Sequence, residues 1–194
     1  MAPHTVVLAT RNPHKLRELR RLLVPAGIAI APLPADVELP PEDGATFAEN
    51  ALRKARAAAM ATASAAIADD SGIEAAALQG APGVRSARYA GPDARDQENL
   101  DKLLREAPPG SALRYVCALA YVDPVNRSER VFFGHCEGRL AARPQGAGGF
   151  GYDPAFLPDA VGDDRTMAEL ADDEKDAISH RGGAARALSA WLGR

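Results

Sequence analysis

The chain has 194 residues, of which 46% are hydrophobic and 25% are charged, and its formal net charge is −3. These values are typical of a globular protein that forms one domain, or two small lobes sharing a sheet. The acidic balance argues against nucleic-acid binding, which needs an extended basic surface. No apolar run approaches the roughly 18 residues that cross a bilayer, and the N-terminus lacks a signal-peptide pattern. We therefore expect a cytoplasmic protein with neither a membrane nor a nucleic-acid partner.

The first predicted elements are a strand and a helix joined by a short loop. Thr5 to Ala9 form a β-branched, apolar run that favours a buried strand. Asn12 suits a helix N-cap, and Pro13 suits the first helical position. A strand that leads into a helix N-terminus leaves backbone N–H groups facing an anion. TRNPHK is therefore a candidate phosphate site, with Lys15 in the first helical turn, although a capped helix with a surface lysine fits equally well.

A second helix is predicted after residue 45. Thr46 and Glu49 have the spacing of a capping box, and an Ala-rich helical run follows. Lys54 comes four residues after Asn50 and so lies on the same helix face. By spacing alone, Lys54 is a surface lysine and Glu49 serves the helix cap.

The next predicted strand, AAIADDSG, ends in two adjacent carboxylates, Asp69 and Asp70, with a turn at Ser71-Gly72. Paired aspartates at a strand end are a common way of holding Mg²⁺. Because successive side chains of a strand point to opposite faces, we expect one of the two to bind the metal directly. Glu42, in a polar loop upstream, is a further candidate carboxylate.

The remaining elements complete a mixed arrangement. A helix is predicted over 97–106, a central strand over Arg114 to Val122, and a hairpin partner over ERVFFGHCEG. Cys117 and Cys136 lie in these strands without a C-x-x-C pattern, so we expect reduced core thiols. Strands and helices that interleave without strict alternation favour an α/β protein with a mixed sheet.

The stretch QGAGGFGYDP contains Gly146, Gly148 and Gly151 at the G-x-G-x-x-G spacing of a dinucleotide-binding turn. That motif belongs between the first strand and first helix of a βαβ unit. Here it comes late and is followed by Pro154, which disfavours a helix. A flexible connection explains the glycines but not the aromatic tail. A third interpretation is a flat slot in which Phe150 stacks on a planar base.

The last polar cluster is EKDAISHRGG, where Lys175, Ser179, His180 and Arg181 gather several hydrogen-bond donors. A single histidine is more often a surface or packed residue. Beside an arginine and a Gly-Gly break, it becomes a candidate for reading a base edge.

Five segments together resemble one family. They are TRNPHK, TFAENALRKA, ADDSGIEAAALQGAPGVRSARYAG, GGFGYDPAF and TMAELADDEKDAISHRG, which occur in this order along the whole chain. They are similar to the inosine triphosphate pyrophosphatase family. The resemblance implies a single domain over 1–194, with an elongated mixed β-sheet flanked by helices and two lobes with a central active-site cleft. It also implies a homodimer and Mg²⁺-dependent hydrolysis of ITP, dITP and XTP to the monophosphate and pyrophosphate.

The same resemblance assigns roles to matching positions. Phosphate binding falls to Thr10, Arg11, Asn12, Pro13, His14 and Lys15. Catalysis falls to Asp70 as general base and metal ligand, with Glu42 as the second metal carboxylate. Ser71 lies beside the substrate, and Asp69, Glu49, Asn50 and Lys54 are supporting candidates. The nucleotide is bound by Phe150, Gly151, Tyr152, Asp153, Lys175, His180 and Arg181.

These roles are chemically coherent. Donors from His180 and Arg181 would accept a 6-oxo purine and reject a 6-amino base, because donor would face donor. Guanine also carries a 6-oxo group, so its rejection has to arise near C2. Alternatives remain: an oxidoreductase using the glycine loop, a nucleotide- or RNA-binding module without catalysis, and a diphosphatase for pyrimidine or modified nucleotides.

Overall fold

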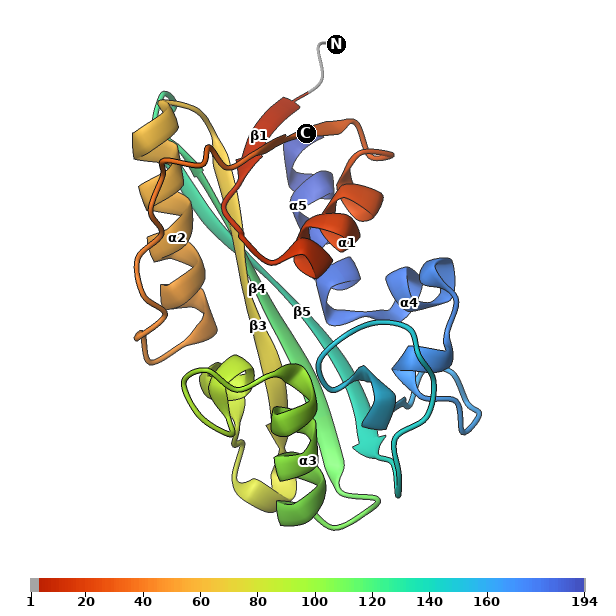
Figure 1. The fold of residues 1–194 in the computed structure, drawn as a ribbon. Coiled ribbons are helices and arrows are strands. Elements are labelled where there is room, and N and C mark those ends of the chain that lie inside the picture. Colours follow the sequence, from red (N-terminus) through yellow and green to blue (C-terminus); the bar gives the residue numbers. More distant parts are fainter. Residues whose placement is uncertain (1–3, 194) are drawn as a thin grey trace. The chain divides into compact units, whose positions relative to one another are not determined.

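The computed structural model describes residues 4–193 and has an α/β fold built on a six-stranded sheet (Figure 1). The strand order is β2-β1-β3-β4-β5-β6. The strands are β1 His4–Leu8, β2 Ile28–Pro32, β3 Ala66–Ala75, β4 Ala112–Asp123, β5 Ser128–Leu140 and β6 Phe156–Pro158. The helices are α1 Pro13–Leu23, α2 Phe47–Thr62, α3 Asp96–Glu106, α4 Asp172–Ile178 and α5 His180–Leu192. β1 is parallel to both β2 and β3, whereas β5 and β6 are antiparallel, so the predicted mixed sheet is confirmed.

The chain forms two compact units. The first comprises Met1–Asp70, Cys117–Gly134 and Arg181–Arg194, and the second comprises Ser71–Val116 and His135–His180. By these bounds, the chain passes from one unit to the other within β3, β4, β5 and the start of α5. No helix in residues 4–193 has both the length and the apolar character that a bilayer crossing needs.

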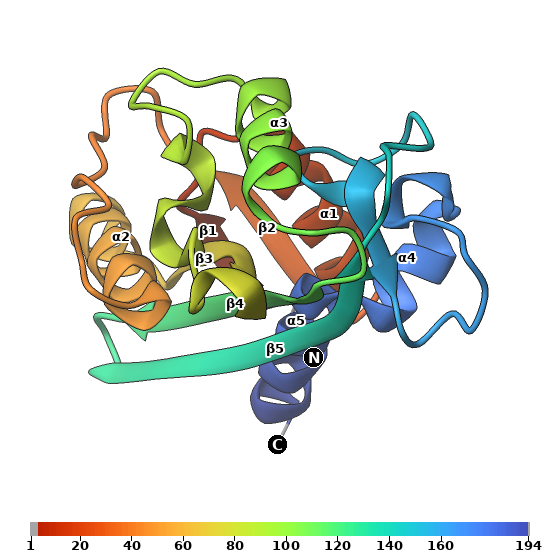
Figure 2. The ribbon, with the colours of Figure 1, turned by 90° about the horizontal axis from the view of Figure 1, so that it is seen from below.

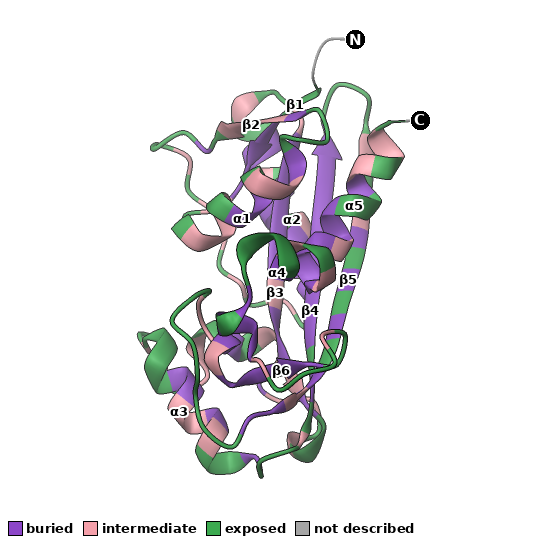
Figure 3. Cartoon of the chain, turned by 90° about the vertical axis from the view of Figure 1, so that its right-hand side faces the viewer, coloured by how far each residue is buried: buried purple, intermediate pink, exposed green. Residues whose placement is uncertain are grey.

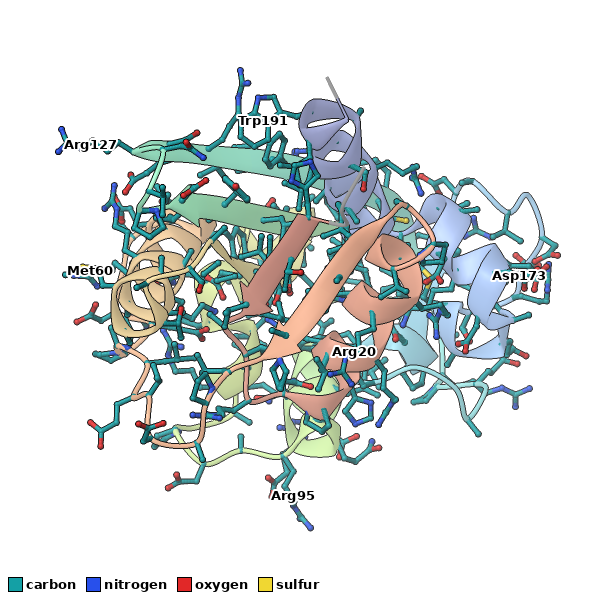
Figure 4. All side chains as sticks on the ribbon, turned by 90° about the horizontal axis from the view of Figure 1, so that it is seen from above. Arg20, Met60, Arg95, Arg127, Asp173 and Trp191 are labelled. Carbon is teal, nitrogen blue, oxygen red and sulfur yellow. The ribbon has the colours of Figure 1, made fainter. Side chains whose placement is uncertain are left out.

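The first unit places helices on both faces of its strands. In Figure 1, α2 covers one face of β3 and β4, while α1 and α5 cover the other. Leu19 and Leu23 of α1 pack with Leu188 of α5 against Ile67 of β3. Figure 3 shows β3 and β4 as largely buried, whereas β5 also carries exposed residues. Figure 4 shows Trp191 of α5 beside the long strands, where its ring lies 5.2 Å from that of Tyr121.

The start of α1 follows from local chemistry, as predicted. The side-chain oxygen of Asn12 accepts the backbone N–H groups of His14 and Lys15, and Pro13 occupies the first turn, where its missing N–H removes no helical hydrogen bond. The predicted cap of α2 is also present, because the hydroxyl of Thr46 accepts the N–H of Glu49.

The second unit has a separate apolar core. Leu100 and Leu103 of α3 pack with Tyr115 of β4 and Phe156 of β6. The 3₁₀ turn Gly83–Arg88 precedes α3 (Figure 2) and is in contact with it. Both cysteines are buried free thiols, as predicted, and burial raises the pKa of each to about 12.

The predicted turn at Ser71-Gly72 is wrong, because β3 continues to Ala75. Ile73 and Ala75 are fully buried in the second core, and the N–H of Ile73 donates to the hydroxyl of Ser86 at 2.9 Å. Burial of two apolar side chains on an extended backbone outweighs the local turn preference of a Ser-Gly pair.

Candidate active site

The loop between β1 and α1 presents a capped helix start. The hydroxyl of Thr10 accepts the N–H of Asn12 at 3.2 Å, and Asn12 in turn caps the helix through His14 at 2.8 Å and Lys15 at 3.3 Å. The ring of His14 lies 2.8 Å from the guanidinium of Arg17. Lys15, in the first turn of α1, directs its ammonium toward the carboxylate of Asp69, at a distance of 3.3 Å.

Arg11 behaves differently from its neighbours. Its guanidinium donates to four backbone carbonyl oxygens of the segment that follows β2, at distances between 2.6 and 3.2 Å. The four acceptors are Leu33, Pro34, Ala35 and Val37. This segment leads to the loop that carries Glu42. In this structure Arg11 therefore holds a loop, and its positive charge is engaged with backbone dipoles.

Asp69 is the centre of a buried ionic network. Its side chain is fully buried, and its Oδ2 atom accepts from Arg181 Nε at 3.2 Å and Nη2 at 3.1 Å. The remaining side of the guanidinium donates to Glu18 at 2.5 Å. Burial alone would raise the pKa of Asp69, but Lys15, Arg181 and Lys54 hold that pKa well below its usual range. Asp69 is therefore a permanent anion at neutral pH.

Asp70 has the opposite electrostatic character. It lies on the other face of β3, where the amide of Asn50 donates to its Oδ2 atom at 2.9 Å. Burial raises the pKa of Asp70 above its ordinary value, and the nearby Glu42 adds to the effect, although Lys54 opposes it. Two adjacent aspartates thus differ in proton affinity because their surroundings differ.

Lys54 is not the surface residue that its helical spacing predicts. It is only 6% exposed, and its side chain reaches from α2 to the backbone of β3. Its ammonium donates to the Glu42 carboxylate and to the backbone oxygen of Asp69 at 2.7 Å, and it lies 3.8 Å from Asp70. Burial raises the pKa of Glu42, but the charge and hydrogen bond of Lys54, together with the charge of Lys15, lower it overall. We call Glu42, Lys54, Asp69 and Asp70, together with Lys15, the carboxylate cluster.

Glu49 lies apart from this cluster. Its carboxylate accepts the N–H of Ala45 at 2.8 Å, and the residue is exposed at the start of α2. This contact belongs to the cap of α2, which is the role that the spacing of Thr46 and Glu49 predicts. Ser71 follows Asp70 in β3 and is half-buried.

The carboxylate cluster has the donor set of a magnesium site. Glu42 and Asp70 both lie near the ammonium of Lys54. No group of three or more histidine, cysteine or acidic side chains suited to a metal occurs in residues 4–193. Mg²⁺ needs no such cage, because one or two carboxylates plus phosphate oxygens and water satisfy it. Glu42 and Asp70 are therefore carboxylates of a kind that could serve such an ion.

In the second unit, Asp153 organises the glycine-rich loop. One carboxylate oxygen, Oδ2, accepts from Lys175 Nζ at 2.6 Å and from the N–H of Phe150 at 2.9 Å. The other, Oδ1, accepts from the hydroxyl of Tyr115 at 3.0 Å. Lys175 is buried in α4, and its ammonium lies 5.4 Å from the centre of the half-buried Phe150 ring.

Two other members of this loop have structural partners. The N–H of Gly151 donates to Asp96 at 3.0 Å, and the hydroxyl of Tyr152 donates to the backbone oxygen of Ser86 at 2.8 Å. Tyr152 is 6% exposed, and burial raises its pKa. Gly149 has φ +68°, and a Cβ atom there would lie 2.1 Å from Asp153 Oδ2, so this glycine is required by close approach.

His180 stacks on Tyr115, a residue that sequence reasoning missed. The two ring centres are 4.6 Å apart and the ring planes differ by 5°. Tyr115 lies in an apolar strand, where it is indistinguishable from a core residue; only its position two residues before Cys117, in the strand predicted to be central, hinted at a buried place. We call Tyr115, Phe150, Asp153, Lys175 and His180 the loop cluster.

The glycine loop does not have the setting of a dinucleotide turn. It follows β5 and leads into a 3₁₀ turn, Asp153–Ala155, and then β6. The dinucleotide motif requires a strand, a turn and a helix in sequence, with the third glycine at the helix start. The oxidoreductase interpretation therefore loses its only support.

A sequence profile of the Ham1 family matches residues 6–191. The chain belongs to the Ham1 family. Membership extends over nearly all of the chain, so both the carboxylate cluster and the loop cluster lie within the matched region.

Relatives and solved structures of the Ham1 family agree with the resemblance drawn from the five segments. A protein of Cutibacterium acnes named dITP/XTP pyrophosphatase is 48% identical, over 94% of this chain and 93% of its own. A protein of the same name from Frankia alni is 50% identical, over 96% of each chain. The structure of a HAM1 protein from Coxiella burnetii has a TM-score of 0.87 and 41% identity, and the match covers 98% of each chain. The predicted α/β fold is thereby confirmed.

Proposed function

We propose that this protein hydrolyses dITP, XTP and ITP to the nucleoside monophosphate and pyrophosphate. The relatives named dITP/XTP pyrophosphatase support the substrate class. The observation that carries the chemistry is the pair Asp69 and Asp70, whose surroundings move their pKa values in opposite directions. Adjacent carboxylates with diverging pKa values are typical of acid–base sites.

The triphosphate would be bound at the start of α1. Lys15 supplies an ammonium in the first turn, and the helix N-terminus adds a partial positive charge. Lys15 keeps one contact with Asp69, which fixes the ammonium in place, and an ammonium has three N–H donors. Thr10 and Asn12 contribute polar side chains from the same loop. In this proposal Arg11 does not bind phosphate but holds the segment after β2 through hydrogen bonds to its backbone carbonyl oxygens.

In the proposed hydrolysis the two aspartates have different roles: Asp70 is the general base, and Asp69 is a permanently ionised carboxylate. Asp70 accepts the proton of the attacking water, since its raised pKa makes it the stronger base of the pair. The water oxygen bonds to the α-phosphorus as the bond from that phosphorus to the bridging oxygen breaks, and pyrophosphate leaves. Asp69 stays ionised throughout and holds Lys15 and Arg181 in position.

The residues that would hold Mg²⁺ are Glu42 and Asp70, completed by phosphate oxygens. The chemistry that Mg²⁺ supplies when bound is neutralisation of phosphate charge. Lys54 contacts both carboxylates, so its ammonium orients them toward a common point.

The base would be bound by the loop cluster of the second unit. Phe150 offers a ring face for stacking, and the imidazole of His180 offers a donor to a 6-oxo group. A 6-amino base would bring donor against donor and leave buried groups unpaired. We assign Arg181 to the support of Asp69 rather than to the base, because Arg181 is 2% exposed and its guanidinium donates to Asp69 and Glu18.

The proposal extends to a homodimer that acts in the cytoplasm, as the family resemblance implies. Light scattering on the purified protein tests the first point, since the chain mass is 20.4 kDa and a dimer doubles it. A monomer at micromolar concentration would remove the dimer from the proposal without touching the chemistry.

The decisive experiment is a panel of nucleoside triphosphates with Mg²⁺ and product identification. We expect pyrophosphate release from dITP, XTP and ITP with kcat/KM at least about 100-fold above that for dATP or dGTP. Equal rates for ordinary and deaminated purines would refute the selectivity. Orthophosphate release would refute cleavage at the α-phosphorus, and a preference for pyrimidines would favour the alternative diphosphatase.

Asp70→Asn tests the base directly. The amide preserves the size of the side chain and its contact with Asn50, so the fold is retained while the proton acceptor is lost. We expect kcat to fall by about 1,000-fold, within the usual range for a general base. The matched control is Asp43→Asn, which alters an exposed carboxylate in the neighbouring loop that pairs only with Arg53 among the contacts described. Asp43→Asn should keep full activity, and an active Asp70→Asn enzyme would refute the assignment.

A further inference from the structure

Tyr115 contacts two residues of the loop cluster: its ring contacts His180, and its hydroxyl contacts Asp153. The face of its ring lies against the imidazole of His180, at 4.6 Å and with nearly parallel planes. Its hydroxyl donates to Asp153 at 3.0 Å. The residue is 6% exposed, so it acts from beneath the surface of the second unit.

The stacked ring restricts the imidazole. A histidine side chain rotates about two torsions, and the second of these is broad when nothing contacts the ring. A parallel aromatic neighbour removes that freedom, because tilting the imidazole would lose the stacking contact. The stack with Tyr115 therefore restricts the plane in which the His180 nitrogens lie.

The hydroxyl of Tyr115 acts on the glycine-rich loop through its hydrogen bond to Asp153. Asp153 uses its second oxygen to bind Lys175 at 2.6 Å and the N–H of Phe150 at 2.9 Å. By occupying the first oxygen, Tyr115 limits the ways in which the carboxylate can turn. The ring of Phe150 and the ammonium of Lys175 are thus held by a group whose own orientation depends on the tyrosine.

A purely structural role accounts for the ring but not for the hydroxyl. A phenylalanine would fill the same place beside Phe156, whose ring lies 4.7 Å away, without burying a polar atom. A buried hydroxyl is tolerated because it is paired, and its partner here is the carboxylate that organises the glycine loop.

We infer that Tyr115 is a positioning residue for base recognition: its ring fixes the plane of His180, and its hydroxyl fixes Asp153 and hence the Phe150 loop. This inference rests on the proposed function, because it assigns Tyr115 a part in binding the same base. Tyr115 itself need not contact the substrate.

The test uses two variants at this position. Tyr115→Leu removes both the aromatic face and the hydroxyl, and we expect KM for dITP to rise about tenfold with kcat changed by less than about twofold. The preference for dITP over dATP should fall by about the same factor, since the imidazole donor is no longer held in one plane. Tyr115→Phe keeps the stack and loses only the hydroxyl, so KM should rise about threefold with the base preference retained.

Tyr121→Leu is the matched control. Tyr121 lies on the same strand, is also 6% exposed, and makes an edge-to-face contact with the ring of Trp191 while its hydroxyl donates to Asp123 at 3.4 Å. Its replacement removes a comparable buried aromatic from the first unit and should lower the melting temperature to a similar extent. KM and base preference should stay at the wild-type values.

An NMR measurement on the unliganded protein separates this inference from the proposed function. The carbon-bound ring protons of His180, identified by their absence in His180→Gln, should be shifted upfield by the tyrosine ring and should move downfield in Tyr115→Leu but not in Tyr115→Phe. Failure of the wild-type protein to release pyrophosphate would refute the proposed function. Unmoved His180 signals, or a Tyr115→Leu enzyme whose KM and base preference match those of Tyr121→Leu, would refute the role of Tyr115.

Discussion

Replacing Glu18 by glutamine tests the energetic weight of the buried ionic network. Arg181 donates to Glu18 at 2.5 Å and to Asp69 at 3.1 and 3.2 Å, and the side chains of the arginine and of Glu18 are 2% and 9% exposed. The substitution preserves shape and an acceptor oxygen but removes one of the two anions beside a buried guanidinium. Asp69 alone must then balance Arg181 and Lys15.

The magnitude follows from burial. Breaking a buried ion pair from one side costs about 3–5 kcal/mol, because an uncompensated charge remains in a medium of low polarity. Glutamine retains a neutral hydrogen bond, which recovers about 1 kcal/mol, so a loss of about 2–4 kcal/mol is expected. With a urea m-value of about 2 kcal/mol/M, the unfolding midpoint should fall by about 1–2 M.

The matched control is Glu129→Gln. Glu129 also accepts two hydrogen bonds from an arginine, Arg56, but these side chains are 40% and 50% exposed. An exposed pair contributes about 0–1 kcal/mol, so its midpoint should move by less than about 0.5 M. Urea unfolding followed by circular dichroism measures both variants. Equal shifts for the two variants would refute the view that burial, and not the mere presence of an ion pair, determines the contribution of Glu18.

Two further predictions concern loops of the candidate site. Arg11→Met removes the guanidinium that donates to four carbonyl oxygens of the segment after β2. Cleavage after Glu38 by a glutamate-specific protease should therefore accelerate about tenfold, while thermal stability stays constant. An unchanged cleavage rate would contradict the role of Arg11 in holding this loop. Gly149→Ala combines a positive φ with a contact on Asp153 and should lose about 2–3 kcal/mol of stability in urea, whereas Gly151→Ala, with a positive φ but open space around it, should lose only about 1 kcal/mol; similar losses would contradict the close approach.

The sequence alone was sufficient for elements whose signals are local. Asn12 and Pro13 predicted the start of α1 because capping depends on the nearest two or three residues. The uniformly apolar stretch around Cys117 predicted an interior strand, because a strand covered on both faces carries no polar alternation. The five motif segments were likewise enough to indicate the family, since their order and spacing are properties of the chain itself.

Local signals failed where distant parts of the chain compete with them. The Ser71-Gly72 pair has turn chemistry, yet β3 passes through it because Ile73 and Ala75 gain a core on the far side. Lys54 has the spacing of an exposed helical residue, and only the packing of α2 on β3 makes it a buried cation between carboxylates.

Tertiary structure also decided which charged groups meet. Arg181 contacts Asp69 across 112 residues of sequence and Glu18 across 163, and no periodicity within a helix or strand encodes such a pairing. The opposite pKa shifts of Asp69 and Asp70 arise because the two faces of β3 are covered by different helices carrying different charges. Tyr115 became a candidate for function only when its ring was found against His180. Sequence specifies which groups are available and which elements carry them, whereas the fold determines the dielectric surroundings and partners that turn those groups into a site.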